Sequence, residues 1–137
     1  MAGAPIDALR SVALFSDLDD AELGQIALLF KERHFAQGET VVKEGAEGAA
    51  FFLVQSGTAS VSVRGNVRTS LGPGDHFGEI ALIDEGVRSA TITATTDLFC
   101  YGLTLWEFRP LVIENGLIGW KLLHSLAQKL RGAELSA

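Results

Sequence analysis

Hydrophobic residues follow a helical period near the start of the chain. Apolar residues recur there at the three- and four-residue spacing of one helix face: Leu23, Ile26, Ala27 and Phe30. Asp19 and Glu22 precede this face at the spacing of a capping box, which places acidic groups near the positive end of the helix. The segment up to about Phe35 is therefore predicted to be helical.

The pattern changes between Gly38 and Leu103, where short β-prone runs alternate with glycines. The runs are Thr40–Val42, Phe51–Val54, Ala59–Val63, Val67–Leu71, Ser89–Thr95 and Leu98–Leu103. Within one of them, Val61 and Val63 alternate with serines, which is typical of a half-buried strand. Many short strands with regular turn signals predict a small antiparallel barrel or sandwich.

The helical period returns after the last of these runs. Thr104 and Glu107 have the spacing of a capping box, and Pro110 predicts a short, kinked or broken helix behind them. Trp106 and Trp120 are expected to pack within the C-terminal helices. The alternative for either tryptophan is an aromatic cap on the base of a ligand.

A final helix is predicted beyond a joint at Gly116 and Gly119, ending near Gly132. One side of it is apolar: Leu122, Leu123, Leu126 and Leu130. The resulting order is N-terminal helices (1–35), a β-barrel (36–103) and C-terminal helices (104–137). This is an α+β fold, and 137 residues are enough for one domain, 1–137, with a real core.

Composition narrows the function classes. The net charge of −6 argues against a nucleic-acid binder, which needs a basic face, but not against one anion in a local positive pocket. Cys100 is the single cysteine, so it is expected to be reduced and buried. No apolar run reaches the roughly 20 residues of a membrane span, and Met1–Arg10 does not have the pattern of a secretory signal. We expect a soluble, cytoplasmic domain.

Metal binding and catalysis receive little support. The three histidines, His34, His76 and His124, are far apart in the sequence. The acidic run at residues 17–22 lacks the spacing of a calcium loop, so it is interpreted as a solvated helix cap. No set of residues is arranged for nucleophilic catalysis. We expect no metal, no cofactor and no enzymatic activity. A cupin-like metalloenzyme remains the alternative from the enzyme class.

The segment Gly74–Thr91 carries the candidate chemistry. Gly78 opens a short apolar turn whose backbone N–H groups can face an anion, and the small Ala81 permits close approach. Arg88 offers a planar fork of donors that matches phosphate oxygens. Glu79 adds an acceptor, which suits a ligand with both a phosphate and a sugar hydroxyl.

Residues 77–91, FGEIALIDEGVRSAT, resemble the phosphate-binding cassette of the cyclic nucleotide-binding domain family. The family includes the catabolite activator protein, the regulatory subunits of protein kinase A and cyclic-nucleotide-gated channels. The resemblance extends to most of the chain through Leu14–Leu18, Gly38–Glu39, Glu44–Gly45 and Phe52–Gly57. Val87 departs from the proline that the family often has before the arginine. The resemblance implies a jelly-roll barrel of the double-stranded β-helix type.

The resemblance also implies roles for the cassette residues. Gly78 and Glu79 are expected to hold the ribose 2′-hydroxyl. The backbone of Ile80 and Ala81 is expected to face the cyclic phosphate. Arg88 would neutralise that phosphate, with a further contact from Ser89.

The base is expected to lie against the barrel near Val67 and Leu71, under a lid from the last helix. The candidate lid residues are Leu126, Lys129, Leu130 and Arg131. In this family a threonine after the arginine often accompanies a preference for cyclic GMP. Ser89 stands there in this chain, so cyclic AMP is the expected ligand and cyclic GMP the alternative.

The leading hypothesis is a non-enzymatic sensor in signal transduction, which binds a cyclic nucleotide and moves its C-terminal helices, with the joint at Gly116 and Gly119 as hinge. A competing hypothesis is a protein-interaction domain of the same fold that no longer binds nucleotide. The effector is expected on another chain or on sequence not present here. A homodimer through the last helix is a further option.

Overall fold

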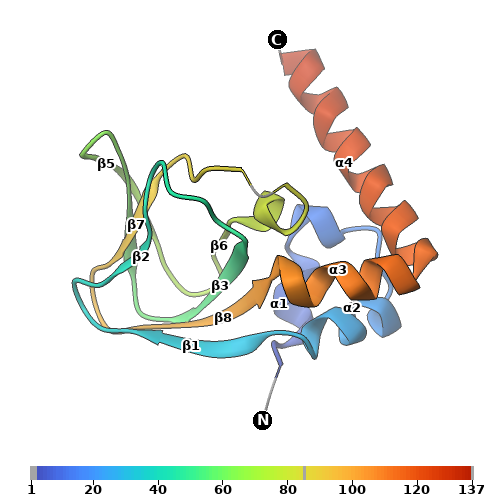
Figure 1. Ribbon diagram of the computed structural model, residues 1–137, viewed down its shortest axis with the longest axis horizontal. Coiled ribbons are helices and arrows are strands. Elements are labelled where there is room, and N and C mark those ends of the chain that lie inside the picture. Colours follow the sequence, from blue (N-terminus) through green and yellow to red (C-terminus); the bar gives the residue numbers. More distant parts are fainter. Residues whose placement is uncertain (1–2, 85, 137) are drawn as a thin grey trace.

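The computed structural model describes residues 3–84 and 86–136, so Glu85 of the cassette lies outside the described residues. Its strands form two four-stranded antiparallel sheets (Figure 1). The first has the order β1-β8-β3-β6: Lys31–Phe35, Leu98–Thr104, Ala50–Ser56 and His76–Phe77. The second has the order β2-β7-β4-β5: Thr40–Val42, Thr91–Ala94, Ala59–Val63 and Asn66–Leu71. The predicted jelly-roll class is confirmed, although the two sheets do not close into one barrel.

Apolar side chains from both sheets form the core between them: Phe35, Phe52, Val54, Ala59, Ile92, Ala94, Leu98 and Cys100. Phe35 and Phe52 meet edge to face, with ring centroids 5.9 Å apart. Cys100 is fully buried here, and its burial raises the pKa of the thiol to about 11. The predicted buried cysteine is therefore confirmed.

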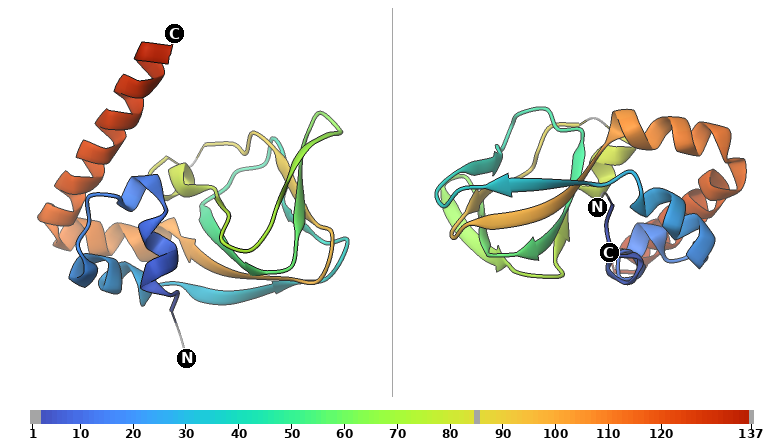
Figure 2. Two further views of the ribbon diagram at one scale, coloured as in Figure 1. Left: turned by 180° about the vertical axis from the view of Figure 1, so that it is seen from behind. Right: turned by 90° about the horizontal axis from the view of Figure 1, so that it is seen from below.

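The helices gather at one end of the sheets (Figures 1 and 2). They are α1 (Ile6–Arg10), the 3-10 helix η1 (Ala13–Phe15), α2 (Asp20–Ala27), α3 (Leu105–Glu114) and α4 (Gly116–Ser136). Phe51 of β3 is fully buried among them, with ring centroids 6.1 Å from Phe15 and 5.8 Å from Phe30. This aromatic cluster fixes the helical end to the first sheet.

Strands β2 and β4 have the predicted bounds, but the helical interpretation of residues up to about Phe35 is wrong at its end. Residues Lys31–Phe35 are strand β1, which pairs with β8 from Lys31↔Gly102 to Phe35↔Leu98. This pairing with residues 63 to 71 positions away along the chain overrides the local pattern. The predicted strand Ser89–Thr95 is also shorter, because β7 begins at Thr91.

The C-terminal helices differ from the prediction in their joint and in their tryptophans. Helix α3 runs through Pro110, and the break before α4 falls at Asn115, whose φ of −127° and ψ of 80° are not helical. Gly119 and Gly132 both lie inside α4. Trp106 and Trp120 are 64% and 70% exposed, so the prediction that they pack is wrong.

Helix α4 is attached to the N-terminal helices along its first half. Ile118 and Leu122 enter the helical core. Lys121 Nζ lies 2.6 Å from Glu22 Oε1, and His124 Nδ1 lies 2.5 Å from Asp17 Oδ2. The remainder of α4 points away from the sheets (Figure 2). The position of α4 is therefore set by its N-terminal half.

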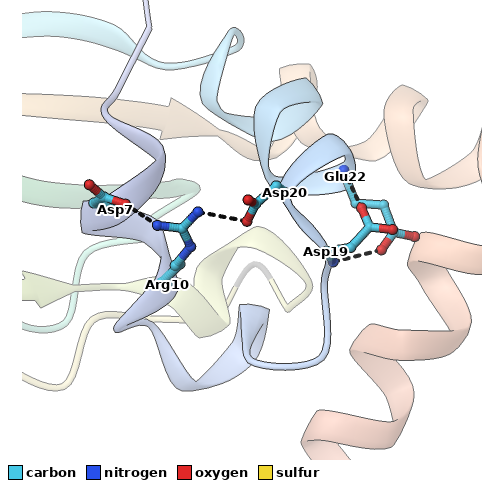
Figure 3. A network of polar contacts seen from close by, with 5 residues as sticks. All are labelled: Asp7, Arg10, Asp19, Asp20 and Glu22. Atoms are coloured by element: carbon cyan, nitrogen blue, oxygen red, sulfur yellow. Dashed lines mark hydrogen bonds and ion pairs between the residues drawn. The ribbon is translucent and has the colours of Figure 1, made fainter.

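The predicted capping box forms at the start of α2 (Figure 3). Asp19 Oδ1 accepts a hydrogen bond from the Glu22 N–H at 2.8 Å, and Glu22 Oε1 accepts one from the Asp19 N–H at 2.9 Å. Arg10 contacts both Asp7 and Asp20. The acidic run is thus engaged in a helix cap and ion pairs, as its interpretation as a cap expects, but Glu22 is buried and not solvated.

We expect Asp19→Ala to lower the free energy of unfolding by about 1 kcal/mol, because it removes the side-chain acceptor of the cap. Urea denaturation measures this loss. Asp20→Ala is the matched control, since it removes an exposed ion pair to Arg10 and should lose clearly less stability. Equal losses in the two variants would contradict the role of the cap.

Candidate functional site

Arg88 is held in place by its own backbone. Its N–H donates to the Ala46 carbonyl at 2.8 Å, and its carbonyl accepts from the Gly45 N–H at 2.8 Å. One residue earlier, Val87 forms a bridge with Glu47. The turn between β2 and β3 is therefore hydrogen-bonded to the chain just before β7, and these bonds fix the position of the Arg88 backbone.

The Arg88 guanidinium is only partly satisfied by the protein. Nη2 donates to the Ala50 carbonyl of β3 at 2.6 Å. Nε is buried and has no hydrogen-bond partner among the described residues. Burial lowers the pKa of Arg88 from its usual value, yet an arginine stays charged at neutral pH. A half-buried positive group with an unused, buried donor atom is suited to an anionic acceptor.

Two glycines make room for this guanidinium. A Cβ at Gly48 would lie 1.9 Å from Arg88 Nε, and a Cβ at Gly78 would lie 2.5 Å from Nη1. Any side chain at either position would displace the arginine. Gly78 was predicted as a site residue and Gly48 was not, because in the sequence Gly48 looks like another turn glycine. Its role arises from a contact across 40 residues.

Gly78 also starts the short 3-10 helix η2 (Glu79–Leu82), with a left-handed φ of 84°. Ala81 N–H donates to the Gly78 carbonyl at 3.0 Å, so this amide is engaged within the turn. Ala81 and Leu82 are buried, whereas Ile80 is 47% exposed. Leu82 belongs to the helical core. The cassette is therefore packed directly onto the core that holds the helices.

Glu79 faces an imidazole ring and the cationic side chain of a lysine. His76 Nδ1 lies 3.4 Å from Glu79 Oε2, and Lys129 Nζ of α4 lies 3.7 Å from Oε1. The pKa of Glu79 is lowered to about 2, chiefly by the interaction with His76 and against the opposing effect of burial. The carboxylate is ionised at neutral pH and available as an acceptor.

Most of the residues predicted to contact the base or to form the lid do not gather around Arg88 and Glu79. Val67 is 70% exposed on β5, while Leu71 packs against the core between the sheets. Ser89 is exposed in the bend before β7. Of the four predicted lid residues, Leu126 packs against the helical core and Lys129 reaches Glu79. Leu130 and Arg131 are exposed. The far half of α4 does not lie over the sheets (Figures 1 and 2).

A separate apolar groove of about 840 Å³ lies between η2 and the helices α3 and α4. Leu82 and Ile83 line it on the cassette side, and Trp120 and Leu123 line it on the side of α4. Its lining includes neither Arg88 nor Glu79, so it is distinct from the charged site.

Across residues 3–84 and 86–136, no group of three or more His, Cys, Asp or Glu side chains could hold a metal ion. Within the same ranges, no helix has the length and apolarity needed to cross a bilayer.

The family model described as cyclic nucleotide-binding domain matches residues 32–115. This range contains Gly48, Gly78, Glu79 and Arg88. The chain belongs to the cyclic nucleotide-binding domain family.

Two curated proteins illustrate the relationship. The chain is 42% identical over 101 residues to Glutaminase 2 of Bradyrhizobium diazoefficiens, covering 73% of this chain and 16% of that protein. It is 33% identical over 109 residues to the cAMP-dependent protein kinase regulatory subunit of Debaryomyces hansenii, covering 78% of this chain and 24% of that protein. The matched region is therefore a small part of each relative.

Solved structures extend the likeness to the fold. The N-terminal domain of a transcriptional regulator from Streptomyces coelicolor A3(2) has a TM-score of 0.85 and 30% identity, covering 93% of this chain and 94% of that one. The cAMP-bound PfPKA-R has a TM-score of 0.68 and 32% identity, covering 96% of this chain and 46% of that one.

We expect Glu79 to stabilise the fold in a pH-dependent way. Its pKa is lowered from 4.5 to about 2, so its contribution is present above about pH 4.5 and is lost as the pH falls towards 2. The difference in free energy of unfolding between the wild type and Glu79→Gln should shrink over this range by at most about 3 kcal/mol. Denaturation at several pH values measures it. A difference for Glu79→Gln that stays constant over this pH range would contradict the assignment.

Proposed function

We propose that this domain binds a cyclic nucleotide through Arg88 and Glu79 and acts as a non-enzymatic regulatory module. The observation that carries the proposal is the Arg88 guanidinium, which lies between two glycines with its buried Nε unpaired among the described residues. A phosphate oxygen is the acceptor that fits such a donor. The membership of the chain in the family supports the same ligand class.

Each part of the ligand has a proposed partner. Arg88 neutralises the cyclic phosphate, with further contacts from the backbone of Ile80 and from Ser89. A contact from the Ala81 N–H would require it to share or leave the Gly78 carbonyl, to which it donates at 3.0 Å. Glu79 and Gly78 hold the ribose 2′-hydroxyl. Because Glu79 keeps its charge down to a pH of about 2, it can accept that hydrogen bond throughout the physiological range. The base lies near Val67 and Leu71.

Cyclic AMP is the proposed nucleotide, with cyclic GMP as the alternative. Ser89 after the arginine favours it, as does the description of one relative as a cAMP-dependent kinase regulatory subunit. A structure that aligns with 96% of this chain is described as cAMP-bound. These likenesses support the choice of ligand without supplying a contact to the adenine.

Ligand binding is proposed to act on α4 by population shift. In the structure α4 reaches the cassette through Lys129 and Glu79, and the non-helical Asn115 at its start is a natural hinge. Occupancy would favour an arrangement in which Leu126, Leu130 and Arg131 approach the base. The effector that responds is proposed to lie on another chain or on further sequence, since the likeness covers only 16% and 24% of the curated relatives.

The first test is a calorimetric titration of cyclic AMP and cyclic GMP into the wild type, Arg88→Lys and Arg88→Ala. We expect micromolar or tighter binding of cyclic AMP to the wild type. Arg88→Ala should weaken it about 100-fold or more, equivalent to about 3 kcal/mol, because the phosphate loses its charged donors. Arg88→Lys, which keeps the charge but loses the fork, should fall between them. A wild type that binds neither nucleotide would favour the nucleotide-free interaction domain.

Gly48→Ala tests the geometry of the site without removing a charge. The new Cβ would lie 1.9 Å from Arg88 Nε, so the guanidinium must move, and we expect cyclic AMP to bind at least about 10-fold more weakly. Gly72→Ala is the matched control, since its Cβ would meet nothing within 4 Å. Unchanged affinity in Gly48→Ala would show that the arginine position seen here is not the one that binds.

A further inference from the structure

His76 lies in β6, two residues before the cassette glycine, and its ring is fixed by packing. Its ring centroid is 5.6 Å from that of Phe51, with an interplanar angle of 73°. The backbone of β6 pairs with β3 at Leu53↔His76. These contacts hold the imidazole against the aromatic cluster and determine the direction in which its nitrogens face.

One of those nitrogens faces Glu79, the residue proposed to bind the ribose. His76 Nδ1 is buried, makes no hydrogen bond to any described residue, and lies 3.4 Å from Glu79 Oε2. This distance is slightly longer than in a usual N–H···O hydrogen bond and the two groups are not aligned as one, so a small movement of the Glu79 side chain is needed to form it. A buried nitrogen without a partner is costly, which favours that movement.

The two oxygens of Glu79 differ in their surroundings. Oε2 faces the rigid, packed His76, whereas Oε1 is approached by Lys129 at 3.7 Å. The lysine side chain is 41% exposed and belongs to α4. Among the described residues, these are the two side chains that lie within 4 Å of the carboxylate as ion-pair partners. His76 is the packed side chain that can keep Glu79 from turning towards the exposed ammonium group of Lys129 or towards solvent.

We propose that His76 is a positioning residue for ribose recognition: Nδ1 holds Oε2 of Glu79, so that the other oxygen accepts the 2′-hydroxyl of the cyclic nucleotide. This inference rests on the proposed function. It assigns His76 no contact with the ligand, because the residue acts through Glu79.

The test compares cyclic AMP with its 2′-deoxy analogue, which lacks the hydroxyl that Glu79 would accept. Both ligands are titrated into the wild type, His76→Phe and His76→Asn. Phenylalanine keeps the ring against Phe51 but removes the donor. Asparagine loses the ring but places an amide nitrogen close to the position of Nδ1.

We expect the wild type to prefer cyclic AMP over the deoxy analogue, and His76→Phe to lose about 10-fold in affinity for cyclic AMP alone. Its affinity for the deoxy analogue should change less than about 2-fold. His76→Asn should recover part of the preference. Binding of the deoxy analogue also reports whether each variant retains a folded site.

The possible failures are distinguishable. If the wild type binds neither ligand, the proposed function itself is wrong. If the wild type prefers cyclic AMP and His76→Phe keeps that preference in full, or loses both ligands equally, the function stands and the role of His76 is overturned. If His76→Phe does not fold, the imidazole nitrogen resonances of the wild type decide: they should shift more with cyclic AMP than with the deoxy analogue, and equal shifts overturn the proposal.

Discussion

The Arg88 side chain is a positive charge that the protein brings out of water and pairs only in part. One nitrogen donates to the Ala50 carbonyl, and Nε has no partner among the described residues. Desolvating a charge is unfavourable unless hydrogen bonds and an opposite charge compensate. The surrounding chain nevertheless holds the side chain in this position. Two glycines leave room for the guanidinium, and a turn fixes the backbone of Arg88 by hydrogen bonds. Such an arrangement is understandable if an anion supplies the remaining compensation.

Strand β3 connects that charge to the helices. Ala50 provides the acceptor for Arg88, and the next residue, Phe51, packs edge to face with the N-terminal helices and with His76. Leu82 at the end of the cassette is buried in the same helical core. A small displacement of η2 must therefore be accommodated by packed side chains, which do not compress easily. The proposed signal to α4 needs no long pathway, because the cassette and the helices share one core.

Local pattern was sufficient for the elements that local sequence specifies. Strand β4 alternates polar and apolar residues, and the Asp19–Glu22 capping box is a short-range device, so both were predictable. Strand β1 was not, since its pairing with β8 is a long-range contact. The cassette motif pointed to Gly78, Glu79 and Arg88, but Gly48 matters only because the fold brings it against Arg88. The exposure of Trp106 and Trp120 likewise depends on how α3 and α4 sit on the other helices, which composition does not specify.

The net charge of −6 bears on how an anionic ligand would bind. The summed field of the molecule repels a phosphate at long range, and salt screens that repulsion over roughly 8 Å at physiological ionic strength. Arg88 acts at contact distance from a half-buried position, where screening is weaker. Glu79 adds negative charge beside it, but the ammonium group of Lys129 lies 3.7 Å from one of its oxygens and offsets part of that charge locally. Affinity in the proposed site would therefore come from slow dissociation of the ligand from the local hydrogen-bond donors. It would not come from fast association by electrostatic steering.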